Sequence, residues 1–191
     1  MTYVMSGEGQ VVRALRIGVP AGIAAGTIMA VWLMVAMWAT GPGFWLPLNL
    51  VAHTFYRSAP LSDTFSVPAL AIGLAVHMSV AVIFGTAITA LVQRLPRQRS
   101  LVIAGGILFA AVVWPVMQYG VWYWIDERAA EGVTGWVFAG AHLIFGLLAA
   151  SIAAIGVADD ETGRRGRHTA LSMPQSAQSA GSLFQPDRRR C

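Results

Sequence analysis

Apolar residues in this chain occur in four long blocks that are separated by short polar segments. The blocks cover about residues 17–39, 67–92, 101–123 and 135–157. Each block exceeds the roughly 18 apolar residues with which a helix crosses the core of a bilayer. The pattern therefore predicts an all-α polytopic membrane protein with four transmembrane helices, which together form one domain over residues 1–158.

Local signals favour helices over these blocks. Ser66 precedes the second block and is a good N-cap residue, and Pro68 lies in the first helical turn, where its missing N–H is harmless. Pro115 lies inside the third block, where proline removes a backbone hydrogen bond. We therefore expect a kink in the third helix.

The connection between the first two blocks is too apolar for a solvated loop and too short to span a membrane. Pro47 can open a short helix that runs through Tyr56, with Asn49 and His53 on one face because they are four residues apart. Its aromatic residues favour the level of the lipid headgroups. The segment therefore predicts an interfacial helix over one end of the bundle.

Composition and charge give the topology. All 13 basic residues are arginine. Eleven of them precede the first block, separate the second from the third, or follow the fourth: Arg13, Arg16, Arg94, Arg97, Arg99, Arg164, Arg165, Arg167, Arg188, Arg189 and Arg190. Only Arg57 and Arg128 lie on the other side. By the positive-inside rule both termini are cytoplasmic, and the acidic loop over residues 125–134 faces outward.

The polar, arginine-rich segment over residues 159–191 predicts a disordered basic cytoplasmic tail. Basic residues confined to loops and tails are typical of membrane topology rather than of nucleic-acid binding. The expected partners are therefore the lipid bilayer and another membrane protein or a second copy of this chain, and not a nucleic acid.

Small residues recur at four-residue spacing in the apolar blocks. Gly18, Gly22 and Gly26 form such a ridge in the first block, while Gly85 and Gly146 lie on comparable ridges in the second and fourth. Small residues at this spacing let two helix backbones approach closely in a membrane. We therefore expect these glycines at helix–helix contacts.

Two histidines lie within the apolar blocks. His77 and His142 share ridges with the small residues, and Gln118 lies near the same end of the third block. With Asn49 and His53 above them, these polar side chains are expected to converge in the outer half of the bundle. An ionisable residue inside a membrane is a functional hypothesis by default.

Four interpretations of the histidines remain open at this stage. His77 and His142 could hydrogen-bond across helices, which stabilises association by about 1 kcal/mol each. They could line a polar pocket for a ligand, a quinone or a proton path. They could be the axial ligands of haem b, or bind a transition metal together with His53. The spacing between helices, which would decide among these, does not follow from the sequence.

A weak internal repeat relates the two halves. The segment 25–41 aligns without gaps on 104–120, and His77 then corresponds to His142, each followed by a Phe-Gly pair. Two repeated hairpins would be related by an axis along the membrane normal, as in some carriers. Chance likeness between Gly/Ala-rich helices is the alternative.

No enzymatic signature is present. None of the four blocks contains an acidic residue, and the chain has no phosphate-binding loop, dinucleotide fingerprint or HExxH motif. We therefore expect a protein without catalytic activity or cofactor, acting as an accessory subunit of a membrane complex or as a membrane stress or integrity protein. The alternatives are a redox subunit that binds haem b or a metal through His77 and His142, and a small carrier with an outward-facing polar pocket.

The segments "FWLPLNLVAHTFYR", "LAVH", "VMQYGVW" and "FAGAHLIFG" resemble small four-helix inner-membrane proteins of bacteria, and the layout loosely resembles the YagU-like family. The resemblance covers about residues 15–158. It implies a multi-pass protein of the bacterial cytoplasmic membrane with a link to acid tolerance. It implies no catalytic residue.

Overall fold

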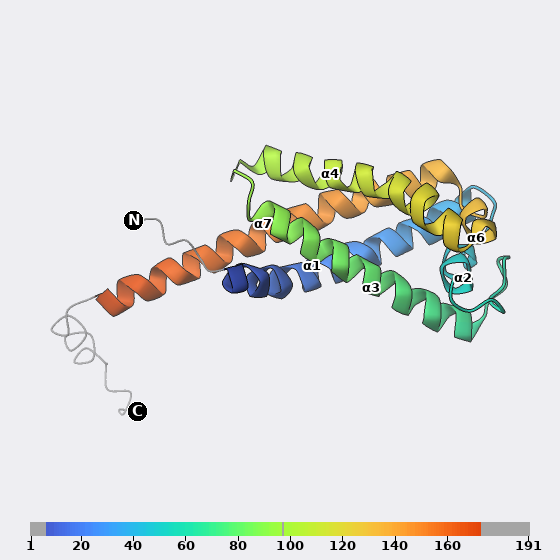
Figure 1. Ribbon diagram of the computed structural model, residues 1–191, viewed down its shortest axis with the longest axis horizontal. Helices are drawn as coiled ribbons and strands as arrows, with labels where there is room; N and C mark the ends of the chain where they lie inside the picture. Colours follow the sequence, from blue (N-terminus) through green and yellow to red (C-terminus); the bar gives the residue numbers. More distant parts are fainter. Residues whose placement is uncertain (1–6, 97, 173–191) are drawn as a thin grey trace, which may run out of the picture. The chain divides into compact units, whose positions relative to one another are not determined.

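The computed structural model describes residues 7–96 and 98–172. Within these ranges every regular element is a helix (Figure 1). In chain order the elements are α1 (Gly7–Ala39), α2 (Leu46–His53), α3 (Val67–Val92), α4 (Arg99–Pro115), the π-helix η1 (Val116–Trp122), α5 (Tyr123–Ile125), α6 (Glu127–Glu131) and α7 (Gly135–Ser172). Four stretches are long and apolar enough to cross a membrane: Gly7–Ala39, Val67–Val92, Arg99–Ile125 and Gly135–Gly163. The predicted all-α fold with four spanning helices is confirmed, and the chain is a multi-pass membrane protein.

Two of the helices are longer than the apolar blocks that predicted them. α1 begins at Gly7 rather than near residue 17, and α7 continues to Ser172. The tail that we expected to be disordered from residue 159 is thus helical up to Ser172, because polar residues can extend a helix that an apolar block has already nucleated. The rest of that tail, 173–191, lies outside the described residues. The chain divides into two compact units after Ile155, and the second begins within α7.

α1 and α3 form a tightly packed pair. A Cβ at Gly22 would overlap the carbonyl oxygen of Ala81, and a Cβ at Gly18 would lie 2.5 Å from the Cα of Thr86. Gly85 of α3 lies directly against Gly22 in return. The glycine ridge of α1 therefore faces α3, where the two backbones are in contact.

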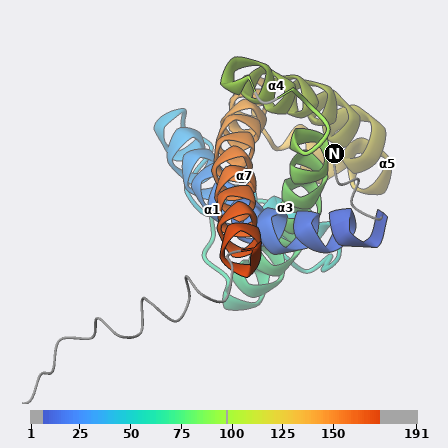
Figure 2. The same ribbon diagram turned by 90° about the vertical axis from the view of Figure 1, so that its left-hand side faces the viewer.

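α4 and α7 form a second pair on the same principle. A Cβ at Gly146 would overlap the backbone carbonyl of Gly106 and lie 2.5 Å from the Cβ of Ala110. A Cβ at Gly106 would in turn meet Ala150 and Gly146. Figure 2 views the helices from the end at which α3 connects to α4. The first unit is thus built from two close helix pairs.

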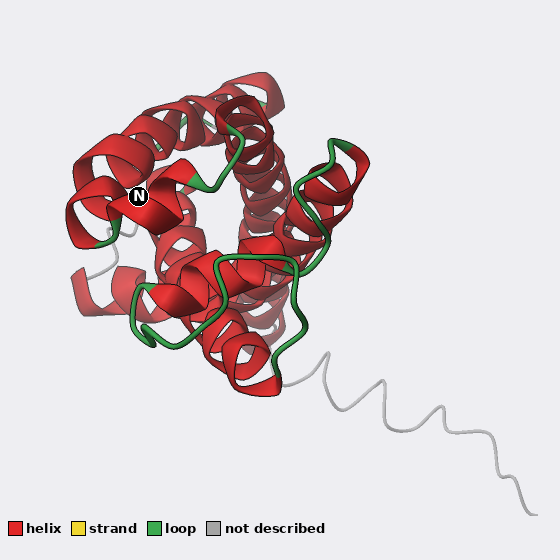
Figure 3. Ribbon diagram, turned by 90° about the vertical axis from the view of Figure 1, so that its right-hand side faces the viewer, coloured by secondary structure: helices red, strands yellow, loops and turns green. Residues whose placement is uncertain are grey.

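The opposite end of the bundle carries the short helices α2 and α6 and is called the α2–α6 end below (Figure 3). A Cβ at Gly73 of α3 would overlap the carbonyl oxygen of Leu48, so α2 lies against α3. Leu50 on the same helix reaches Gly132, next to α6. α2 therefore forms where we predicted an interfacial helix, but it is packed among other elements, with Asn49 only 2% exposed.

The expected kink at Pro115 takes the form of a change in helix type. α4 ends at Pro115, and the next seven residues wind as the π-helix η1. Pro115 has no N–H to donate to the preceding turn, which loosens the hydrogen-bond ladder at this point. π-helical turns are rare and frequently occur at functional sites. Here the wider turn directs Met117, Val121 and Trp122 into a cavity.

Candidate functional site

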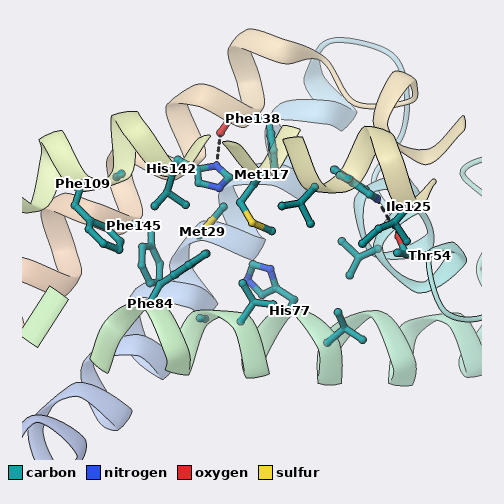
Figure 4. A pocket seen from close by; sticks show the side chains of 18 of the residues that line it. Met29, Thr54, His77, Phe84, Phe109, Met117, Ile125, Phe138, His142 and Phe145 are labelled. Atoms are coloured by element: carbon teal, nitrogen blue, oxygen red, sulfur yellow. Dashed lines mark hydrogen bonds between the residues drawn. The ribbon is translucent and has the colours of Figure 1, made fainter. Parts of the chain in front are cut away.

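A partly open cavity of about 220 Å³ lies among the helices of the first unit. Residues of α1, α2, α3, α4, η1 and α7 contribute to its walls (Figure 4). The walls are almost entirely apolar, and six aromatic side chains line them: Phe55, Phe84, Phe109, Trp122, Phe138 and Phe145. An apolar concave site with a few polar groups is the usual form of a small-ligand site.

His77 and His142 both line this cavity. The ring nitrogen Nε2 of His77 donates to the carbonyl oxygen of Gly26 on α1, at 2.9 Å. The ring nitrogen Nδ1 of His142 donates to the carbonyl oxygen of Phe138 on its own helix, also at 2.9 Å. A carbonyl oxygen can only accept, so each contact fixes which nitrogen carries the proton.

Hydrogen bonding across helices, one of the interpretations left open by the sequence, holds for His77 but not for His142. His77 joins α3 to α1, and His142 bonds back within α7, so no hydrogen bond connects the two rings. The physical reason lies at Gly26, which has no side chain and therefore leaves its backbone oxygen accessible to a ring on the neighbouring helix.

His53 belongs to a separate charged cluster at the α2–α6 end. Its Nδ1 donates to Oδ2 of Asp126 at 2.6 Å, and Arg57 binds the same oxygen at 2.7 Å. The carboxylate is buried, while Arg57 is largely exposed and also donates to the carbonyl oxygen of Ile125. These three side chains are called the Asp126 network below. They tie α2 to the start of α6.

Asp126 also caps α6, because its Oδ1 accepts the backbone N–H of Ala129. Burial alone would raise the pKa of this carboxyl, but the hydrogen bonds from His53 and Ala129 and the charges of His53 and Arg57 together outweigh burial. The pKa of Asp126 is therefore lowered from its ordinary value. Asp126 is an ionised anchor between two connections rather than a titrating group near neutral pH.

The other two predicted polar residues bond to backbone at the same end. Asn49 donates from Nδ2 to the carbonyl oxygens of Ser62 and Thr64, at 2.9 Å each, and so fixes the long connection before α3. Gln118 donates to the carbonyl oxygen of Ala130 at 2.8 Å. Both side chains are buried, and their roles are structural in these contacts.

The five polar residues therefore do not form one polar pocket, which was one of the interpretations left open by the sequence. Asn49, His53 and Gln118 are used in hydrogen bonds that hold the α2–α6 end together. Only His77 and His142 face the cavity, which is apolar. Burying a polar group without a partner is costly, and each of the five side chains donates a hydrogen bond to a carbonyl or carboxylate oxygen.

Sequence reasoning missed two groups of residues. Asp126 and Arg57 were assigned to outward loops, although an acidic residue directly after an apolar run could have indicated a helix cap. Met29 and Met117 also line the cavity and gave no signal, because methionine is common in apolar helices.

The transition-metal set of His53, His77 and His142 is not assembled. His53 pairs with Asp126 and does not line the cavity that holds the other two histidines. Among the side chains that the structure describes, no group of three or more His, Cys, Asp or Glu is arranged to hold a metal ion.

Comparison with known proteins adds no relative. No protein-family model, no curated protein and no solved structure matches the chain.

Proposed function

We propose that this chain is a non-catalytic protein of the bacterial cytoplasmic membrane, an accessory component that holds a small ligand in its cavity. The observation that carries the proposal is the cavity itself, about 220 Å³ in volume and walled by four membrane-spanning segments. Natural cores contain few voids of more than a water molecule. A larger space at the meeting point of four helices therefore favours a binding role.

The lining of the cavity argues against catalysis there. Among the described residues, the wall has two histidines but no acidic side chain to orient either ring. The one hydroxyl, on Thr54, accepts a hydrogen bond from Nε1 of Trp122 at 2.9 Å. A nucleophile with its base and orienting group, the arrangement that acyl transfer requires, is not assembled in this wall.

Haem b, which two histidines at similar depth suggested, is not supported by the size of the cavity. An engineered cavity of about 150 Å³ accommodates one benzene. A porphyrin contains four pyrrole rings and their substituents, and a space of about 220 Å³ is small for it. A ligand with the size of one substituted ring matches this volume better, and a metal ion would occupy only a small part of it.

The test compares two neighbouring variants on α4. Val113→Phe places bulk into the cavity, whereas Val112 is 57% exposed and Val112→Phe changes only the lipid-facing surface. The full chain is purified in nanodiscs of native lipid, and bound organic molecules and metals are measured by mass spectrometry. We expect wild type and Val112→Phe to retain the same ligand and Val113→Phe to lose it. Equal content in all three, or an empty wild type, would contradict the proposal.

The orientation rests on the arginine distribution and has its own test. The α2–α6 end is proposed to face outward, with the connection between α3 and α4 in the cytoplasm. Glu131 and Gln98 are both exposed and lie at opposite ends of the bundle. In a Cys191→Ser background, Glu131→Cys should react with an impermeant thiol reagent on intact cells, and Gln98→Cys should react only after lysis. The opposite result would reverse the topology.

A further inference from the structure

Four side chains in the cavity carry atoms that can bind a soft metal ion. Met29 comes from α1, His77 from α3, Met117 from η1 and His142 from α7. Each of the four spanning segments thus contributes one of these four side chains. In the view of Figure 4 the sulfur atoms of Met29 and Met117 lie between the two imidazole rings.

The hydrogen bonds of both histidines leave one unprotonated nitrogen on each ring, which can bind a metal. Nε2 of His77 and Nδ1 of His142 carry the protons that they donate to backbone carbonyls. Nδ1 of His77 and Nε2 of His142 therefore keep their lone pairs. Histidines that bind metals almost always donate their other ring N–H to a carbonyl or carboxylate, which fixes the ring in this way.

The chemistry of the ligand set selects the ion. Thioether sulfur is a soft ligand that favours Cu(I), and imidazole binds copper well. All four ligands are neutral, and no carboxylate or thiolate lines the cavity among the described residues. A divalent ion would bring two uncompensated charges into an apolar site, and that cost is far higher than for one charge.

We propose that Met29, His77, Met117 and His142 form an intramembrane binding site for Cu(I). The site rests on the proposed function, because it names the ligand that the cavity holds. It also explains why two histidines and two methionines meet in a wall that is otherwise almost entirely apolar.

The experiment measures Cu(I) affinity of the full chain in nanodiscs. Copper is kept reduced with ascorbate, and the protein competes for it with the chelator bathocuproine disulfonate. Met29→Leu and Met117→Leu remove sulfur at nearly constant volume, which cores tolerate well. Met37→Leu is the matched control, since Met37 is fully buried on α1 but does not line the cavity.

We expect wild type and Met37→Leu to bind one Cu(I) with equal affinity. Met29→Leu and Met117→Leu should each bind at least about tenfold more weakly, a loss that even an outer-shell partner of a metal can produce. X-ray absorption of the copper-loaded protein should show sulfur and nitrogen neighbours, and the sulfur contribution should decrease in each cavity variant. Zn²⁺ should not compete.

The proposal is overturned if wild type binds no Cu(I), or if all three methionine variants bind it as wild type does. In either case, the mass spectrometry of wild type and Val113→Phe in nanodiscs shows whether the cavity binds another ligand. A small organic molecule retained by wild type and lost in Val113→Phe would leave the cavity a binding site for another ligand. An empty cavity in that experiment would remove both.

Discussion

In both helix pairs of the first unit, glycines let the two backbones pack closely, but the α1–α3 pair has more of these contacts than the α4–α7 pair. Gly85 of α3 and Gly146 of α7 each follow a phenylalanine and each pack against the backbone of the partner helix. α1 meets α3 along a ridge of three glycines, whereas the contact of α4 with α7 centres on Gly106. The first pair is also joined by a side-chain bond from His77, while His142 bonds within its own helix.

Close packing within each helix pair is compatible with a cavity between the two pairs. Small residues bring backbones into contact within each pair. Between the pairs, Phe84, Phe109 and Phe145 line a space that they do not fill. The cavity thus lies between two helix pairs that are each closely packed.

The largest expected effect lies in the first pair. Gly22→Leu should destabilise the protein by at least about 3 kcal/mol, since its Cβ alone would overlap the backbone of Ala81. Val31→Leu, on the exposed face of α1, should change little. Thermal unfolding in detergent and the yield of monodisperse protein measure both variants. Equal behaviour would mean that the contact between α1 and α3 is not at these glycines.

The Asp126 network holds the connections of both pairs together, and its effect should depend on pH. Because its pKa is lowered in the folded state, Asp126 contributes stability that is present above the ordinary carboxyl pKa of about 3.9 and is lost as pH falls through the lowered value. Asp126→Asn should cost about 1–3 kcal/mol near neutral pH.

The same variant supplies the control for this pH dependence. Asn keeps the ability to cap α6 but carries no charge for His53 and Arg57. Its melting temperature should therefore change less than that of wild type between about pH 5 and pH 3. Parallel profiles for the two proteins would show that the carboxylate charge does not stabilise this end.

In each helix pair, one buried side-chain amide stabilises the segment that connects the two helices, and the two amides can be compared. Asn49 donates two hydrogen bonds to the connection in the first pair, and Gln118 donates one to the connection in the second. With about 1 kcal/mol for each bond, Asn49→Ala should destabilise by about twice as much as Gln118→Ala. Thermal unfolding of the two variants checks the order, and the reverse order would assign the firmer connection to the second pair.

The last comparison concerns the loss of stability when each of the two histidines is replaced by alanine. His77→Ala removes a bond between two helices and should cost about 1 kcal/mol more than His142→Ala, whose bond lies within one helix. Since the rings are not bonded to each other, the metal-free losses should add in the double variant. A coupling energy above about 0.5 kcal/mol would show that the rings act as a pair.

Local patterns in the sequence were sufficient to predict the four spanning helices. The predicted second helix, residues 67–92, matches α3 at both ends, because Ser66 caps it and Pro68 fits its first turn. The ridge of Gly18, Gly22 and Gly26 could be placed on one face from its spacing alone. Apolar length and helical period are properties of neighbouring residues in the chain, so the sequence contains them directly.

The partners of the polar residues were decided by the tertiary structure. His53 meets Asp126 across 73 positions in the chain, and His77 meets Gly26 across 51. The gathering of Met29 and Met117 beside the two histidines depends on how each helix is rotated and where it crosses its neighbours. Those quantities are set by the packing of all four helices together, and no local pattern in the sequence specifies them.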